Sequence, residues 1–196
     1  MSQISILPRL LGNLMFEYPS SERNQAILNQ LGHIPVLFPW DNPEQIAALI
    51  STLEDTKNNL NDYAFSVLFE GQGKLIAPPW GSVYQHRENE VMGDSTEAFR
   101  LFLEHIGMNI EIGSQPCDHF AIMLWAIAYT LENEQDEALV ELLEIHLLPW
   151  SNRYLSLLKS NQDSAFYAAV SELCELFLSQ LQHQLQVTPQ AKQLYW

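Results

Sequence analysis

The stretch SQPCDHFAIMLWAIAYTL, residues 114–131, constrains the fold of this chain most strongly. Ser114 can cap a helix here, and Pro116 falls in the first turn, where no intrahelical N–H is needed. The residues that follow are apolar on nearly every side, which is typical of a helix that is buried on all faces. The sequence therefore predicts a helix over 114–131 at the centre of the fold.

Helical spacing of apolar residues recurs along the rest of the chain. In residues 3–18, for example, Ile6, Leu10 and Leu14 fall on one stripe. No run of alternating β-branched residues is long enough to indicate a strand. We therefore predict an all-α fold, a single-domain helical bundle of about nine helices that spans residues 1–196. The expected helices cover 3–18, 21–31, 44–57, 59–70, 96–106, 114–131, 134–147, 149–159 and 163–186.

Charge and cysteine content limit the function classes. The 196 residues include 24 acidic and 9 basic ones, and the net charge of −15 repels phosphate backbones and favours cationic partners, so nucleic-acid binding is not expected. Cys117 and Cys174 lie far apart without a CxxC partner, which supports neither a disulfide framework nor a zinc site of the usual spacing. The longest apolar run, 120–129, is too short to cross a bilayer, and no secretory signal is recognisable. We expect a reduced, cytoplasmic protein without stable membrane insertion.

The connection APPWGSVYQHRENEVMGDST, residues 77–96, is richer in proline, glycine and aromatic residues than a packing loop needs. Loops held by prolines make good walls for a binding groove, because little ordering entropy is lost when a ligand binds. The other interpretation is that these aromatic residues simply cover the end of a helical bundle. The residues alone leave both interpretations open. Asp94 or Ser95 is expected to cap the helix that follows.

Cys117, Asp118 and His119 form the most enzyme-like group and raise a Cys/His hydrolase as an alternative function. A catalytic triad converges from distant parts of a chain, however, whereas consecutive residues near a helix start point in different directions. The structural alternative is that Asp118 complements the positive end of a helix and that His119 packs beneath a loop. No metal-ligand spacing or complete phosphate-binding loop is present, so no catalytic residue, metal ion, nucleotide or other cofactor is expected.

Four blocks of sequence together resemble the TorD/DmsD family of redox-enzyme maturation chaperones, and their order and spacing are most similar to those of the DmsD branch. The blocks are LFEGQGKLIAPPWGSVY (68–84), MGDST (92–96), QPCDHF (115–120) and HLLPWSNRY (146–154). The resemblance implies an all-helical, non-catalytic cytoplasmic chaperone that binds the twin-arginine signal peptide of a molybdenum-cofactor oxidoreductase. Such a chaperone delays export by the Tat translocase until cofactor-loading proteins have acted.

The DmsD branch implies dimethyl sulfoxide reductase as the client. A molybdoenzyme of the trimethylamine N-oxide or nitrate reductase type is the alternative client. The long connection 71–93 is compatible with a monomer or with a domain-swapped dimer.

The resemblance also implies, motif by motif, a set of signal-peptide-binding residues. Apolar burial is expected to supply most of the affinity, because an exposed ion pair contributes only about 0–1 kcal/mol. Asp118 is expected to pair with a signal-peptide arginine, and His119 to orient Asp118 or bind the peptide backbone. The full set is Phe65, Leu68, Phe69, Pro79, Trp80, Ser82, Tyr84, Gly93, Asp118 and His119, with Leu68, Phe69, Pro79 and Trp80 as walls of an apolar groove.

One position departs from the family pattern. Family members usually read Glu-Pro-x-Asp-His, whereas this chain has Gln115 in place of the glutamate. The substitution removes a carboxylate that could grip an arginine and leaves Asp118 as the local anion.

Overall fold

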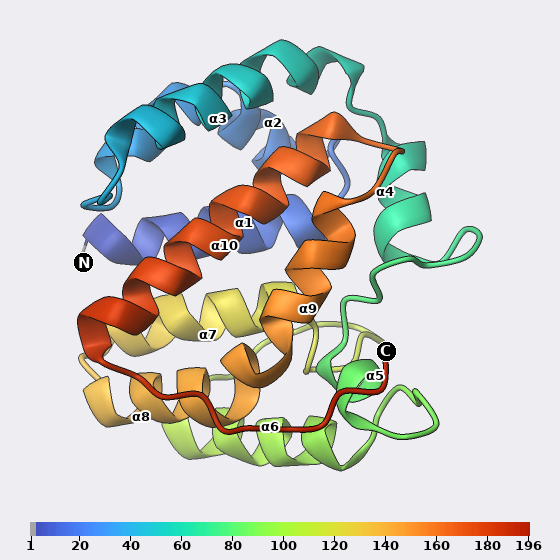
Figure 1. The fold of residues 1–196 in the computed structure, drawn as a ribbon, viewed down its shortest axis with the longest axis vertical. Coiled ribbons are helices and arrows are strands. Elements are labelled where there is room, and N and C mark those ends of the chain that lie inside the picture. The colour runs from blue at the N-terminus through green and yellow to red at the C-terminus, as the bar shows by residue number, and fades with distance from the viewer. Residues whose placement is uncertain (1–2) are drawn as a thin grey trace.

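The computed structural model describes residues 3–196, and the first two residues of the predicted 1–196 domain lie outside the described residues. The described chain forms ten α-helices and no β-strand, which confirms the all-α prediction (Figure 1). The α-helices are α1 (Ile6–Phe16), α2 (Glu22–Leu28), α3 (Pro43–Thr56), α4 (Asp62–Phe69), α5 (Gly81–Gln85), α6 (Asp94–Ile106), α7 (Phe120–Glu132), α8 (Asp136–Glu141), α9 (Leu148–Lys159) and α10 (Ala165–Leu185). Three 3-10 helices, η1 (Gln3–Ser5), η2 (Leu31–Val36) and η3 (Lys57–Asn59), and a π-helix, η4 (Leu142–Leu147), complete the order.

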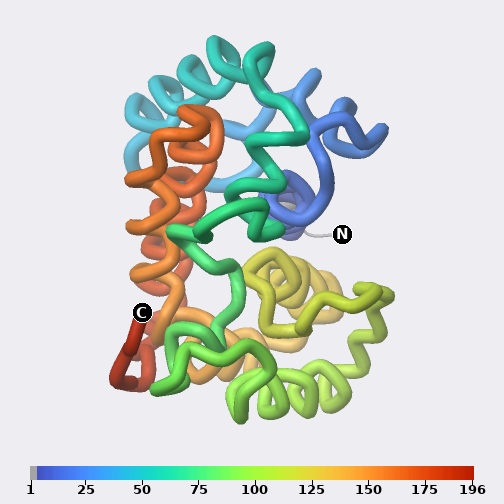
Figure 2. The backbone as a smooth tube through the Cα atoms, turned by 90° about the vertical axis from the view of Figure 1, so that its right-hand side faces the viewer, coloured from blue at the N-terminus to red at the C-terminus, as the bar shows by residue number. Residues whose placement is uncertain are grey.

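Helices α1, α7 and α10 occupy the middle of the molecule, with α2 and α3 above them and α6 and α8 below them in the view of Figure 1. Helix α1 packs along α7, while α10 packs on α9 and on α3. The turned view in Figure 2 shows the C-terminal residues returning to lie beside the segment that contains α5. None of the described helices is long and apolar enough to cross a membrane.

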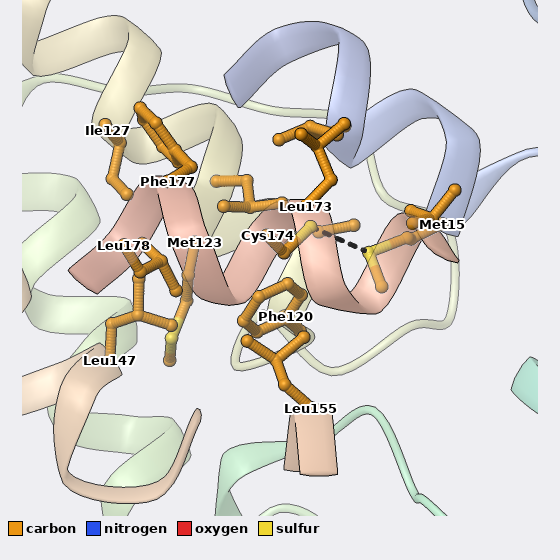
Figure 3. Packing of buried hydrophobic residues seen from close by; sticks show 14 of the residues in the cluster. Met15, Phe120, Met123, Ile127, Leu147, Leu155, Leu173, Cys174, Phe177 and Leu178 are labelled. Atoms are coloured by element: carbon orange, nitrogen blue, oxygen red, sulfur yellow. Dashed lines mark hydrogen bonds between the residues drawn. The ribbon is translucent and has the colours of Figure 1, made fainter. Parts of the chain in front are cut away.

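Apolar side chains from nearly all of these helices form one buried cluster. Figure 3 shows Phe120 and Met123 of α7 among side chains of α10, with the thiol of Cys174 3.9 Å from the sulfur of Met15. The predicted central helix is therefore present, because α7 is buried on nearly all sides. It begins at Phe120 rather than near 114, however, with His119 as its N-cap.

Local side-chain capping explains four of the other nine α-helix starts. The side chains of Ser21, Asn42, Asn61 and Ser164 each accept a backbone N–H in the first turn that follows, which satisfies a donor that the helix leaves free. The expected cap of α6 at Asp94 or Ser95 is wrong, because Gly93 is the N-cap and makes no side-chain bond.

A π-helix joins α8 to α9 and fixes the path of the C-terminal residues. Pro149 has no N–H, so it cannot donate a helical hydrogen bond to the carbonyl of Glu144 or of Ile145 in the preceding turn. The Glu144 carbonyl instead accepts the N–H of Gln190 at 2.8 Å. The Ile145 carbonyl accepts a hydrogen bond from Nζ of Lys192 at 3.0 Å. The C-terminal segment thus satisfies the backbone groups that the irregular helix releases.

Candidate functional site

The start of α5 and the residues before α7 are joined by a short antiparallel bridge. The bridge pairs Trp80 with His119. Its two backbone hydrogen bonds, of 2.8 and 3.1 Å, connect residues 79–81 with residues 118–120. The structure therefore brings together two of the sequence blocks from which site residues were predicted. The bridge also holds His119 in an extended conformation, which is why α7 starts later than expected.

Asp118 lies beneath this bridge and is fully buried. Its Oδ2 accepts the backbone N–H of Ser82 at 2.7 Å, so the carboxylate caps the first turn of α5, which has no side-chain cap at its N-cap residue. Asp118 thus complements the positive end of a helix, as the structural alternative expected. That helix is α5, which is far away in sequence, and not α7, which follows Asp118.

The remaining polar atoms around Asp118 are poorly satisfied. Burial raises the pKa of the carboxyl group, and the nearby N–H and hydroxyl groups of Ser82 and the hydroxyl of Thr96 offset part of this effect. Neither hydroxyl makes a hydrogen bond of regular geometry, and Oδ1 of Asp118 has no partner within residues 3–196. A buried polar atom without a partner costs about 1–3 kcal/mol, so this cluster would be stabilised by a ligand that supplies donors.

His119 is buried between aromatic rings. Its Nδ1 accepts the N–H of Ala121 at 3.1 Å, which caps α7. The ring of Phe16 meets it edge-on at 5.3 Å, and that of Trp80 lies 6.2 Å away. Burial lowers the pKa of His119 to about 3, so the imidazole is neutral near pH 7. A neutral ring in this position acts as a cap and a packing group.

Trp80 is the member of the bridge that keeps part of its side chain at the surface. Its indole N–H donates to Oε1 of Gln115 at 3.2 Å, so the residue that replaces the family glutamate still supplies an acceptor. Gly93 lies next to the same cluster, because a Cβ at this position would be 3.8 Å from that of Ser82. Trp80, Ser82 and Gly93 are thus neighbours in space.

The predicted residues of α4 form a second, separate group. The ring of Phe69 lies 4.9 Å from that of Phe65 and 4.9 Å from that of Tyr167 in α10. Phe65, Leu68 and Phe69 are each at most 3% exposed, and Pro79 is also buried. In this conformation these side chains belong to the core and present almost no surface to a peptide.

Tyr84 is likewise fully buried. Its ring stacks on Trp150 at 5.3 Å, and its carbonyl accepts the N–H of Tyr195 at 2.9 Å. Gly81 allows this packing, because a Cβ there would approach Trp150 to 2.9 Å. Tyr84 therefore links α5 to α9 and to the C-terminal segment.

The end of α1 connects the two groups and was missed by the sequence analysis. Phe16 contacts His119, and two residues later Tyr18 packs on Phe65 at 5.1 Å. Tyr18 also donates its hydroxyl to Glu70 at 2.6 Å. The signal that could have found this segment is FEYPS, an aromatic and acidic run before a proline, of the same kind as the connection 77–96.

The chemistry of Cys117 does not support a hydrolase. Its Sγ contacts the carbonyl oxygen of Thr96 at 3.4 Å. Burial, together with the charge of Asp118, raises the pKa of Cys117 to about 11, so little of the nucleophilic thiolate forms at neutral pH. Within residues 3–196, no group of three or more His, Cys, Asp or Glu side chains could hold a metal ion.

Comparison with known proteins places this chain in a family. The family model described as nitrate reductase delta subunit matches residues 39–156. The chain is also 31% identical over 193 residues to the Tat proofreading chaperone DmsD of Salmonella typhimurium, covering 97% of this chain and 95% of the relative. The chain belongs to the TorD/DmsD family. Its similarity to the DmsD branch confirms the resemblance drawn from the four sequence blocks.

Further relatives of the TorD/DmsD family match most or all of the chain. A Haemophilus influenzae protein named "Probable Tat proofreading chaperone DmsD" is 31% identical, with 100% of this chain and 98% of that protein covered. The chaperone protein TorD of Ferrimonas balearica is 26% identical, with 89% and 82% covered. A solved redox enzyme maturation protein from Archaeoglobus fulgidus, 19% identical, superposes with a TM-score of 0.54 over 88% of this chain and 93% of that one, which shows the shared fold.

Proposed function

We propose that this TorD/DmsD protein is a cytoplasmic Tat proofreading chaperone. It binds the twin-arginine signal peptide of a molybdoenzyme, with dimethyl sulfoxide reductase as the client, and catalyses no reaction itself. The observation that carries this proposal is the similarity, over nearly the whole chain, to proteins named Tat proofreading chaperone DmsD.

The electrostatics of the chain support a cationic ligand. A signal peptide has a basic start followed by an apolar run, and a chain with a net charge of −15 attracts such a peptide over a distance and speeds encounter. Next to the bridge between Trp80 and His119, the buried carboxylate of Asp118 has one oxygen without a partner among the described residues. A guanidinium could supply the missing donors, since it offers five N–H groups in a planar fork.

Access to Asp118 requires a change of conformation. The carboxylate is covered by the bridge between Trp80 and His119, so an arginine reaches it only when residues 79–82 move away from α7. The same opening would expose Pro79 and Ser82, which are both buried in the closed site. The predicted binding residues are therefore proposed to contact the peptide in an opened state of the site.

Calorimetric titration with the synthetic leader of dimethyl sulfoxide reductase tests this function. We expect saturable binding of one leader per chain and none of a scrambled leader of the same composition. Binding of the leader of a trimethylamine N-oxide reductase or a nitrate reductase, and not of the dimethyl sulfoxide reductase leader, would identify a different client. Binding of no molybdoenzyme leader would overturn the proposal.

A further inference from the structure

Two adjoining cavities run along α1, away from the buried residues that the family resemblance singles out. The first, of about 520 Å³, lies between α1 and α2, and the second, of about 440 Å³, continues towards the end of α1. They share Arg9, Asn13 and Arg23, so together they form one groove, here named the α1 groove. The surface of the first cavity is mostly apolar and includes Ile6, Leu10, Ala26 and Ile27. Its polar lining residues are Arg9, Asn13, Arg23, Gln30 and Glu132.

The second cavity connects the α1 groove to the candidate site. Phe16 and Trp125 line it, and their rings lie 4.8 Å apart. Phe16 also meets the ring of His119. The indole of Trp125 rests directly on α1, because a Cβ on Gly12 would lie 2.5 Å from its nitrogen. A peptide in the α1 groove would therefore reach the neighbourhood of His119 without entering the core.

The second cavity is lined by two carboxylates, those of Glu17 and Glu111, and by two guanidinium groups, of which that of Arg9 is paired with Glu132. Glu111 has no ion-pair partner among the described residues. Glu17 is paired with Arg23, but the glutamate side chain is 25% exposed and the arginine 61%. The carboxylate is thus held against the wall while the guanidinium lies mostly in solvent. Since an exposed pair is weak, a ligand guanidinium can replace Arg23 with little loss.

We propose that the α1 groove is the docking site for the signal peptide in the closed conformation. The two arginines bind Glu17 and Glu111 in the second cavity, and the first apolar residues after them fill the first cavity. This inference rests on the proposed function. The eleven residues of α1 extend for about 16 Å, which matches about five residues of extended peptide, enough for an arginine pair and the start of an apolar run.

A blocking variant tests the apolar half of the groove. Ala26 is exposed on α2 and lines the first cavity, so Ala26→Trp fills the cavity without disturbing the core. The matched control is Ala48→Trp, at an exposed alanine of α3. We expect Ala26→Trp to weaken leader binding about tenfold or more in calorimetric titration, and Ala48→Trp to bind as wild type does. Equal affinity of Ala26→Trp and wild type would overturn the groove assignment while leaving the proposed function in place; a wild type that binds no leader would overturn the function itself.

Removal of Arg23, which competes for Glu17, tests the charged half of the α1 groove. This substitution is expected to strengthen leader binding, whereas Ala26→Trp is expected to weaken it. Arg23→Ala frees Glu17, whereas Arg100→Ala removes the same charge from ion pairs on α6. We expect Arg23→Ala to bind the leader about two- to fivefold more tightly than Arg100→Ala does. If the two variants bind equally, any gain reflects overall charge, and Glu17 is not the arginine site.

Discussion

Asp118 accepts its hydrogen bond from Ser82, 36 residues earlier in the chain. The motif resemblance singled out both residues but assigned Asp118 to a ligand, because the protein partner of a buried carboxylate is set by tertiary packing and not by local spacing. The same holds for Tyr84, whose ring partner Trp150 lies on another helix. The sequence motifs therefore singled out several residues that gather around the bridge, but they also included the separate group of α4 and could not predict which side chains face inward.

A pair of substitutions at Asp118 separates its hydrogen bond from its charge. Asp118→Ala leaves the buried N–H of Ser82 without an acceptor, so we expect the free energy of unfolding to fall by about 1–3 kcal/mol. Asp118→Asn keeps an acceptor oxygen, so its free energy of unfolding should fall clearly less. Urea denaturation measures both. Equal losses would mean that the negative charge, rather than the bond to Ser82, stabilises the bridge.

Among the predicted binding residues, Trp80 has a large side chain that is partly exposed to solvent. Trp80→Ala should weaken leader binding about tenfold, as expected for an aromatic anchor, while the protein stays folded because the side chain is only partly buried. Calorimetry and thermal denaturation report the two effects, and Tyr195→Ala, at an aromatic residue that is 41% exposed, serves as the control. An unfolded Trp80→Ala protein would instead assign Trp80 to the core.

At the scale of the elements, the helical period predicted long helices well and short or interrupted ones poorly. Helix α10, with one continuous apolar stripe and a serine cap, falls close to its expected range of 163–186. Helix α5 was missed, because five residues do not show a period and its cap comes from Asp118. The start of α7 was placed too early, because nothing local reveals that 118–119 pair with another segment.

The contact of α1 with α7 depends on a glycine. Gly12→Ala would place a Cβ 2.9 Å from the carbonyl oxygen of Ala121 as well as against Trp125, so the helices must separate. We expect a loss of about 1–3 kcal/mol in the free energy of unfolding, as for other overpacked contacts. Gly32→Ala is the control, since a Cβ there meets nothing within 4 Å. Equal stability of the two variants in urea would show that α1 and α7 tolerate a wider separation.

At the scale of the whole molecule, two buried histidines make the fold sensitive to acid. Burial lowers the pKa of His119 to about 3 and that of His146 to about 4. Both groups are neutral when buried, so their contribution to stability is complete above the unfolded pKa of about 6.5 and is lost as pH falls towards the folded values. Asp118 acts in the opposite sense, because its raised pKa favours the protonated form and its contribution is lost as pH rises through the folded pKa.

We therefore expect the free energy of unfolding to decline between about pH 6.5 and pH 4, by up to about 1.4 kcal/mol per pH unit for each histidine. The imidazole of His146 packs against the rings of Phe99 and Phe102, so His146→Leu keeps an apolar contact and should reduce the slope by about half. Urea denaturation across this pH range gives the slope, with His105→Leu at an exposed position of α6 as control. An unchanged slope in His146→Leu would place the acid sensitivity elsewhere.

The bridge between Trp80 and His119 has a consequence for the order in which the chain folds. Its two residues are far apart in sequence, so closing the intervening loop costs chain entropy before any of its bonds form, whereas α3 and α10 can develop from local contacts. A five-residue helix that depends on that closure cannot persist without it. The region around the bridge is thus expected to assemble last and to open first, with amide exchange at Gly81 and Ser82 running ahead of global unfolding. Under the proposed function, the part of the chaperone that contacts its client would also be the last part of the chaperone to become ordered.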